Sequence, residues 1–412
     1  MEIIIGLAVG IVLIGAGTLA ISAMLRSHVT LQKSQSASAF AQGFIVTLPA
    51  LARADWNSLA GLSRGSSSPY FLVASSTSLI PIPGGEGILD NDVMGGLVAR
   101  WGFDEATGAL AYDSLGHGNI GMLVSEPTRA SSTCAVSGCL SFNGVNSYVN
   151  VPATSSLDIS GPMTLAAWVK WNSFKNYGVV AQKASGGGVV TMDYALWSYV
   201  NNNIVGYIGN GVSSNAISFQ SAAVLTTGVW HHLALVVDGA TLGLYVDGIA
   251  RATSSQTIVP APNVSPFTIS EPSYAINGSV DEVRLYNRAL TSGEIQRLYA
   301  ASPFTRSFYL ETACRTTNAS SAIAGVEPCV GGTAADPSTL SAIVQVTWPV
   351  GAAHGSAEAR TYLIRGGNET FRQTDWSGGA GEADPIVTPG SRFATSTGAD
   401  ITGGGSIRIH GL

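Results

Sequence analysis

The chain has 412 residues, a formal net charge of −6 and only 11% charged residues, against roughly 25% in a typical soluble protein. The length allows two or three domains, and the 49 glycines with short alternating runs of Ser, Thr, Val and Asn indicate many strands joined by turns. Because no cluster of Lys and Arg follows the first apolar segment, nucleic acid is not an expected partner.

The first predicted element is a helix, because residues 3–25 form an apolar run without a charge. At about 1.5 Å per residue, this run is long enough to cross a hydrocarbon core of roughly 30 Å. A secretory signal peptide has a basic start and a shorter apolar core, so we expect a transmembrane helix that anchors the chain in the membrane. The helix is predicted to continue amphipathically to Trp56-Asn57, with Pro49 kinking or interrupting it.

Glu2 stands at the start of this apolar segment, where a carboxylate is costly unless something pairs with it. The stretch from Glu2 to Leu7 (EIIIGL) resembles the start of the mature helix of type IV pilins and pseudopilins. The resemblance implies that Glu2 is an assembly residue, which pairs with the N-terminal amine of a neighbouring pilin-like subunit. The family's basic leader would then lie upstream of Met1. The alternative is a plain signal anchor with an incidental glutamate.

From about Gly96 the sequence changes to short strands. Alternation of apolar residues over 161–171 and 230–238 indicates half-buried strands, and Asp247-Gly248 indicates a tight turn. Strands at this spacing predict an antiparallel sandwich or jelly roll. By their period of two, the residues expected to face inward are Leu165, Val169, Leu233, Leu235, Val237, Leu244 and Val246. Trp168 and Trp230 fall on the opposite phase, so their direction stays open.

Six phrases of this region, in order, resemble the laminin-G-like, concanavalin A-like jelly rolls of bacterial surface proteins. They are LVARWGFDEATG (97–108), CLSFNGVNSYVNVP (139–152), MTLAAWVKW (163–171), VWHHLALVVDG (229–239), LYVDG (244–248) and GSVDEVRLYNRALTSGEIQRLY (278–299). In the last phrase, Thr291 and Glu294 predict a capping box at the start of a short helix. The resemblance implies a mainly β fold with an antiparallel concanavalin A-like sandwich, which binds glycans or protein surfaces.

Members of this family often hold calcium at one rim, and calcium prefers several carboxylate and carbonyl oxygens. By resemblance, the candidate Ca²⁺ ligands are Asp104, Asp113 and Asp281. The chain has Asn146-Ser147 where the family often has an aspartate, which weakens any one proposed site. The alternative is that the three aspartates cap turns and anchor loops.

An aromatic-rich stretch follows in the middle of the sandwich region. Its aromatic residues are Tyr194, Trp197, Tyr199 and Tyr207. Such side chains can stack on sugar faces, so they are candidate glycan-binding residues; the alternative is that they belong to the core.

No catalytic residues are predicted. His231 and His232 lie inside a strand pattern common to the family, where one faces in and one faces out. Related sandwich enzymes that cleave glycosidic bonds carry two closely placed carboxylates, and no strand here shows such a pair. A nucleophile elbow and a phosphate-binding loop are also missing from the sequence.

The four cysteines fall in two close pairs, Cys134 with Cys139 and Cys314 with Cys329. Their spacing does not match a zinc site. Two local disulfides are predicted, which place the chain in an oxidising, extracytoplasmic setting; the alternative is four buried thiols.

Strands are predicted again at residues 305–311, 340–348 and 360–364. Residues 306–379 resemble the β-region of pilin-like proteins from uncultured small-genome bacteria. In that pattern, the stretch from Asp55 to Glu86 directly precedes the Phe308-Tyr309 strand, whereas here the sandwich separates them. We therefore expect the sandwich to be inserted into a pilin-like domain. The alternative is three independent domains in a row.

The predicted domains are a pilin-like helix (1–57), a discontinuous pilin-like β-region on which the helix packs (58–94 with 302–380), the sandwich (95–300), and a Gly-rich linker or strand (381–412). The expected function is that of a non-enzymatic cell-surface protein, a minor pilin or pseudopilin that displays a glycan- or protein-binding module. One alternative is a membrane-anchored carbohydrate-binding protein that does not enter a filament. Another is a carbohydrate-active enzyme.

Overall fold

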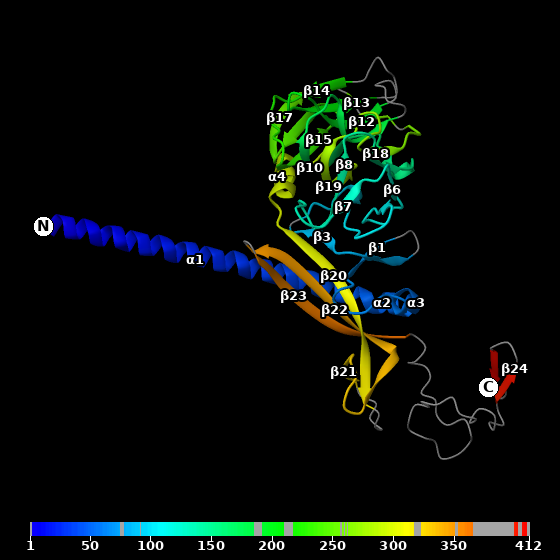
Figure 1. Ribbon diagram of the computed structural model, residues 1–412. Coiled ribbons are helices and arrows are strands. Elements are labelled where there is room, and N and C mark those ends of the chain that lie inside the picture. Colours follow the sequence, from blue (N-terminus) through cyan, green and yellow to red (C-terminus); the bar gives the residue numbers. More distant parts are fainter. Residues whose placement is uncertain are drawn as a thin grey trace. The chain divides into compact units, whose positions relative to one another are not determined.

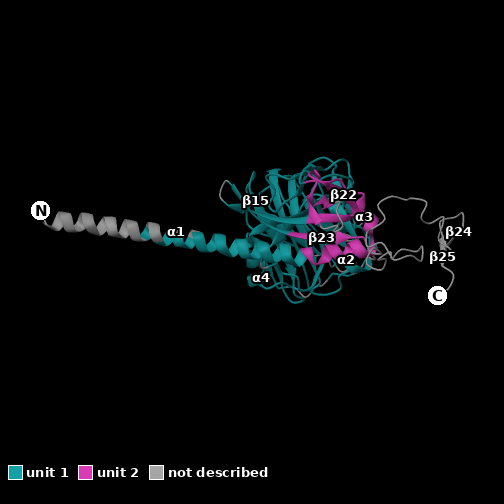
Figure 2. Cartoon of the chain, turned by 90° about the horizontal axis from the view of Figure 1, so that it is seen from below, with its two compact units in different colours: residues 1–44, 66–309, 343–359 teal, residues 45–65, 310–342, 360–412 magenta. Residues whose placement is uncertain are grey.

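The computed structural model describes residues 2–74, 78–90, 92–184, 192–209, 217–255, 258, 260–261, 263–316, 323–350, 353–365, 399–402 and 406–409 (Figure 1). In the first helix, the side chains of residues 2–17, 19–20, 23 and 26 lie outside the described part. The chain divides into two compact units, residues 1–44 with 66–309 and 343–359, and residues 45–65 with 310–342 and 360–412 (Figure 2).

Three helices follow one another at the N-terminal end of the chain: α1 (Glu2–Ile45), α2 (Thr47–Ala54) and α3 (Trp56–Ala60). The predicted interruption lies at Val46, so that Pro49 falls in the first turn of α2, where a proline is tolerated. Asp55 caps α3 by accepting the Ser58 amide at 3.2 Å. When only the residues whose side chains the structure describes are counted, no helix is long and apolar enough to cross a membrane. Glu2 and most of the predicted span, residues 3–25, lie outside those side chains.

One seven-stranded sheet has the order β2-β1-β20-β22-β23, with β3 and β21 also paired to β20. Its strands are β1 (Tyr70–Ala74), β2 (Leu79–Pro83), β3 (Glu86–Leu89), β20 (Pro303–Thr316), β21 (Ile323–Val326), β22 (Thr333–Val350) and β23 (Ala353–Ile364). The three predicted strands of this region are therefore present, each longer than expected. A separate short hairpin joins β24 (Ala399–Thr402) to β25 (Ser406–Ile409), and residues 366–398 lie outside the described part.

The middle of the chain forms two antiparallel sheets of eight strands. The first sandwich sheet contains β4 (Leu97–Trp101), β7 (Thr128–Ala130), β8 (Cys139–Asn143), β10 (Met163–Ser173), β15 (Trp230–Val237), β16 (Leu242–Val246), β17 (Ile249–Ser254) and β19 (Asn277–Tyr286). The second sandwich sheet contains β5 (Leu110–Ala111), β6 (Gly121–Val124), β9 (Tyr148–Val151), β11 (Gly178–Ala184), β12 (Met192–Ser198), β13 (Ile204–Ile208), β14 (Ile217–Gln220) and β18 (Phe267–Ile269). The predicted antiparallel β-sandwich is thus confirmed.

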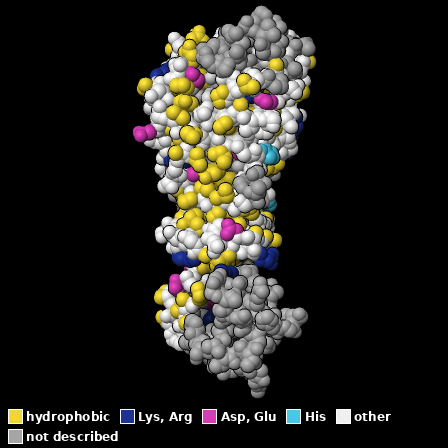
Figure 3. Space-filling model, turned by 90° about the vertical axis from the view of Figure 1, so that its right-hand side faces the viewer, with side chains coloured by type: hydrophobic (Ala, Val, Ile, Leu, Met, Phe, Trp, Pro, Cys, Tyr) yellow, Lys and Arg dark blue, Asp and Glu magenta, His cyan; other side chains and the backbone are white. Residues whose placement is uncertain are grey.

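The core lies between these two sheets. All seven residues predicted to face inward belong to one buried cluster, together with aromatic side chains such as Trp101 and Phe267, whose stacked rings lie 5.0 Å apart. Most of the side chains that Figure 3 colours by type are uncharged, in keeping with the low content of charged residues.

The outer side of the first sandwich sheet is covered by α4 (Ser292–Ala300), whose predicted capping box between Thr291 and Glu294 is confirmed. Trp168 faces outward here, and its ring stacks on Tyr299 at 5.8 Å and meets His232 at 5.3 Å. Because α4 covers this side, a strand residue on the outer phase can still be buried. His232 is 2% exposed for this reason.

Candidate functional site

Five aromatic side chains gather on the outer side of the second sandwich sheet, and we name them the aromatic face. They are Tyr177, Trp197, Tyr199, Tyr207 and Tyr274. On β12 and β13, the neighbouring residues Leu196 and Ile208 point into the core, so the period of two turns Trp197 and Tyr207 outward. The two edge tyrosines, Tyr177 and Tyr274, come from the segments that precede β11 and β19.

The rings of the aromatic face touch in a continuous chain. Trp197 lies 4.5 Å from Tyr207 and 5.7 Å from Tyr177, and Tyr177 lies 4.9 Å from Tyr199 and 5.7 Å from Tyr274, measured between ring centroids. These distances fall in the range that favours tilted and edge-to-face aromatic pairs. Trp197 is only 6% exposed, so the tyrosines around it present the accessible surface.

Tyr177 holds an unusual backbone conformation, with φ at +61°. A bulky residue in the left-handed region costs roughly 1–2 kcal/mol and persists only where its surroundings hold it. Here the ring contacts with Trp197, Tyr199 and Tyr274 provide that support. The result is an aromatic ring that is 38% exposed at the edge of a buried tryptophan.

The polar side chains that reach the rings of the aromatic face belong to Gln182 and Ser218, while the Glu271 side chain accepts the backbone amide of Tyr274 at 2.9 Å. Trp197 Nε1 donates to Gln182 Oε1 at 3.1 Å, and Ser218 is the cross-strand partner of Tyr207. A hydrogen bond with Tyr177 raises the pKa of Tyr199, and burial raises the pKa of Tyr207. Both phenols therefore stay protonated at neutral pH, and each can donate and accept a hydrogen bond.

The position of Tyr194 contradicts part of the prediction made from the sequence. Its side chain is 0% exposed, and its hydroxyl donates to the Leu157 carbonyl at 3.0 Å inside the core. Because it lies three residues from Trp197 on the same strand, it must point to the opposite side of the sheet. The prediction that Tyr194 contacts a ligand at the surface was therefore wrong. Tyr177 and Tyr274 were not predicted as part of the site, because their only signals in the sequence are single tyrosines beside turns.

Each of the three candidate calcium ligands accepts a hydrogen bond from at least one backbone amide. Asp104 accepts from Gly87 at 2.8 Å and from Gly138 at 3.0 Å. Asp113 accepts from the amides of Arg100 and Leu115 and from the Asn119 side chain. Amide N–H groups on these carboxylate oxygens fit loop anchoring, the alternative that the sequence left open.

Asp281 is fully buried, and its Oδ2 accepts the Val136 amide at 2.7 Å. Burial raises the pKa of Asp281 and of Asp104 well above the ordinary value. A protonated carboxyl is a poor calcium ligand. Within the described ranges, no group of three or more His, Cys, Asp and Glu side chains is arranged to hold a metal ion.

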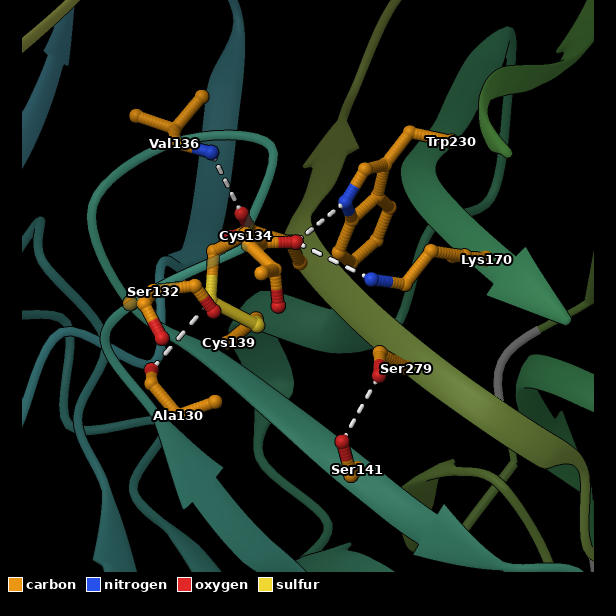
Figure 4. The surroundings of a disulfide bond; sticks show 12 residues. Ala130, Ser132, Cys134, Val136, Cys139, Ser141, Lys170, Trp230 and Ser279 are labelled. Carbon is orange, nitrogen blue, oxygen red and sulfur yellow. Dashed lines mark hydrogen bonds between the residues drawn. A yellow bond between two sulfur atoms is a disulfide. The ribbon is translucent and has the colours of Figure 1, made fainter. Parts of the chain in front are cut away.

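Both predicted disulfides are confirmed, Cys134–Cys139 and Cys314–Cys329. The first closes the loop that Asp281 supports, and Figure 4 shows Trp230 and Lys170 directed at the same loop. Trp230 Nε1 donates to the Thr133 carbonyl at 2.8 Å, and Lys170 Nζ does so at 3.1 Å. Trp230 thus faces away from the core, as the opposite phase of its strand requires.

Both ring nitrogens of His231 are hydrogen-bonded, one to Asp247 and the other to Thr226. Its Nδ1 lies 2.8 Å from Asp247 Oδ2, and its Nε2 lies 2.9 Å from Thr226 Oγ1. The Thr226 amide also donates to Nε2, at 3.1 Å. This donation occupies the nitrogen that a general base would need, so the arrangement acts as a clip on the loop before β15.

Residues 143–296 match the family described as the concanavalin A-like lectin/glucanases superfamily. No curated protein matches the chain. Domain 4 of the GH43 extracellular arabinanase AbnA from Geobacillus stearothermophilus, solved with arabinotriose, is similar at 20% identity, over 49% of this chain and 98% of that one, with a TM-score of 0.41.

Two further solved structures are similar. The binding domain of Paraclostridial mosquitocidal protein 1 shares 13% identity over 65% of this chain and 73% of that one, with a TM-score of 0.43. The sialidase of Trypanosoma rangeli shares 22% identity over 50% of this chain and 33% of that one, with a TM-score of 0.40. The middle of the chain is a concanavalin A-like sandwich of the laminin-G type.

Proposed function

We propose that this chain is a non-enzymatic surface protein that binds glycans through the aromatic face of its sandwich. The observation that carries the proposal is the exposed ring of Tyr177, which is held at a positive φ over Trp197. Sugar rings have apolar C–H faces and polar edges. A cluster of tyrosines with uncharged donors and acceptors suits both features, since rings pack on the faces and hydroxyls bond the edges.

The ligand class follows from the same groups. Gln182, Ser218 and the tyrosine hydroxyls are neutral at physiological pH, so they favour neutral oligosaccharides over sialylated or uronic-acid chains. Anionic sugars are bound best by arginine or lysine, which form charge-assisted hydrogen bonds to carboxylates. A glycan array probed with the full chain tests this. Selective binding of neutral oligosaccharides is expected, and binding confined to protein or to anionic glycans would contradict it.

We further propose that the N-terminal helix anchors and assembles the protein as a minor pilin or pseudopilin, with Glu2 as the assembly residue. In support, α1 runs without a break from Glu2 to Ile45, and its last turns contact β20. Phe40 lies 5.4 Å from Phe304, and Phe44 lies 5.9 Å from Phe308, between ring centroids. A helix whose C-terminal half packs on a sheet is the arrangement that the resemblance to pilins implies.

The mature N-terminus of protein from sheared surface filaments tests this second proposal. Mass spectrometry is expected to find a processed start a few residues before Glu2, with a modified amine and the protein in the filament fraction. An unprocessed start, with all protein in the membrane fraction, would leave a membrane-anchored carbohydrate-binding protein. Turnover of a glycan that is lost with one carboxylate would instead support a carbohydrate-active enzyme.

A further inference from the structure

A lysine is completely buried at one end of the sandwich core. Lys183 on β11 is 0% exposed, and its cross-strand partners are Tyr194 on one side and Phe267 on the other, both core residues. Its Nζ donates to the Asn263 carbonyl at 2.7 Å and to the Ser265 carbonyl at 2.8 Å. A charged ammonium in apolar surroundings is costly, so this group gains if its charge is paired or removed.

The third neighbour of this nitrogen is the side chain of Asp158. Its Oδ1 lies 2.9 Å from Nζ of Lys183, yet this oxygen accepts no hydrogen bond within the described part of the chain. A neutral amine has two N–H donors and one lone pair. The two backbone carbonyls occupy both donors, which leaves the lone pair for the side on which Asp158 lies. The carboxyl carbon is one bond from Oδ1, which brings it close to the roughly 3–3.5 Å at which reacting atoms meet.

A second carboxyl group lies beside this pair. Asp193 falls where the pairing of β11 and β12 shifts register, and its side chain is 0% exposed. Neither of its oxygens has a hydrogen-bond partner among the residues that the structure describes. Burial raises the pKa of Asp193 to about 8, against the attraction of Lys183, and the negative charge of Asp158 adds to the rise. At neutral pH this group is therefore mostly a carboxylic acid, which can donate one proton and accept another.

We propose that Lys183 and Asp158 join in an isopeptide bond, with Asp193 as the residue that transfers the protons. The ammonium first gives one proton to the Asp158 carboxylate. The Nζ lone pair then attacks Cγ and the C–N bond forms. The Asp193 carboxyl takes a proton from the nitrogen on one oxygen and gives its own proton to the leaving hydroxyl from the other. The C–O bond breaks, one water leaves, and Asp193 is again protonated.

The product suits the site better than the ion pair does. The amide replaces a buried ammonium and a carboxylate by one neutral group, and it keeps an N–H that can donate to one of the two backbone carbonyls. Asp158 lines an open cavity of about 730 Å³ with His117, Ser156 and Asn287, so the released water can leave. The bond ties β11 covalently to the segment that precedes β10. The inference is independent of glycan binding.

Mass spectrometry of the intact full chain tests the proposal. The mass is expected to be lower, by one water molecule, than the mass of the sequence with its two disulfides. After reduction and digestion with trypsin, one branched peptide is expected to join residues 130–170 to residues 176–251, because trypsin does not cut after an acylated lysine. The variants Lys183→Arg and Asp158→Ala should keep their full mass, since each lacks one reacting group. The matched control Lys170→Arg changes another lysine and should still lose one water.

Two further variants test the chemistry of the step. Asp158→Asn is expected to reach the same final mass as the wild type, because the amine then displaces ammonia and forms the same amide. Asp193→Asn lacks the protonated carboxyl and is expected to form the bond about a hundredfold more slowly after refolding. An equal rate would contradict the role of Asp193. A wild-type chain of full mass that trypsin cuts after Lys183 would overturn the proposal, and so would a loss of water at another pair of residues.

Discussion

Glu86 and Arg306 lie 220 positions apart in the sequence, yet they are cross-strand partners on β3 and β20, and their side chains form an ion pair of 2.6 Å. Every strand of the sandwich lies between them in the chain. The polypeptide therefore enters and leaves the sandwich through two paired strands. Closely placed ends are what an insertion into a host loop requires, so this pairing is compatible with the predicted insertion of the sandwich, which stays a prediction.

This relationship predicts that the sandwich is more stable with its two flanking strands than without them. The Gly87 amide donates to the buried Asp104, and Arg100 Nη2 donates to the Gly87 carbonyl at 2.6 Å. A fragment of residues 84–306 is expected to exceed a fragment of residues 95–300 in free energy of unfolding by at least about 2 kcal/mol, because each unpaired buried group costs roughly 1–3 kcal/mol. Urea unfolding measures the difference, and equal stabilities would contradict this role of β3.

The lowered pKa of His232 predicts that the stability of the sandwich depends on pH. Burial and the positive charge of Arg284 lower the pKa of His232 from 6.5 to about 4. Between these values the unfolded chain binds the proton more readily, so the free energy of unfolding falls as the pH drops through this window. Its contribution is fully present above pH 6.5.

The slope expected from this one group is up to about 1.4 kcal/mol per pH unit. The variant His232→Gln should have a shallower acid limb in urea unfolding between pH 6.5 and 4. The exposed His354 on β23 provides the control His354→Gln, whose acid limb should match the wild type. An unchanged slope in His232→Gln would show that other groups dominate acid unfolding.

The loop closed by Cys134–Cys139 is predicted to matter to the sandwich in particular. Replacing both cysteines with serine is expected to cost about 2 kcal/mol from the entropy of a short loop, and more because the Val136 amide then holds Asp281 less firmly. Fluorescence of Trp230, which donates to the Thr133 carbonyl in this loop, is expected to report the change. Replacing both Cys314 and Cys329 with serine should leave the unfolding transition of the sandwich unchanged. An equal loss of sandwich stability in the two double variants would contradict this assignment.

The strand positions and the core of the sandwich could be predicted from the sequence because they depend on local patterns. Period-two alternation places Leu165 and Leu233 inward, and the spacing of Thr291 and Glu294 gives the helix cap. The aromatic face could be predicted only in part. Tyr194 and Trp197 lie three residues apart on β12, so the period of two puts them on opposite faces, a pattern that the prediction did not apply to this stretch.

Contacts between distant segments could not be predicted from the sequence. Tyr177 and Tyr274 join Trp197 because β11 pairs with the segment before β19 through the bridge between Val179 and Ala275, which no local pattern encodes. Lys183 gave no sign of burial either, since a lysine in a strand is ordinarily solvated. Its partners Asp158 and Asn263 come from segments on either side of it in the chain.

Glycan binding by two tyrosine variants tests the central claim most directly. Tyr177 and Tyr362 are equally exposed, at 38% each, but only Tyr177 belongs to the aromatic face. With the neutral oligosaccharide that the full chain binds best, calorimetry is expected to show about tenfold weaker affinity for Tyr177→Ala, equal to ~1.4 kcal/mol, and wild-type affinity for Tyr362→Ala. Unchanged affinity in a folded Tyr177→Ala chain would contradict the account, because the ligand would then bind elsewhere.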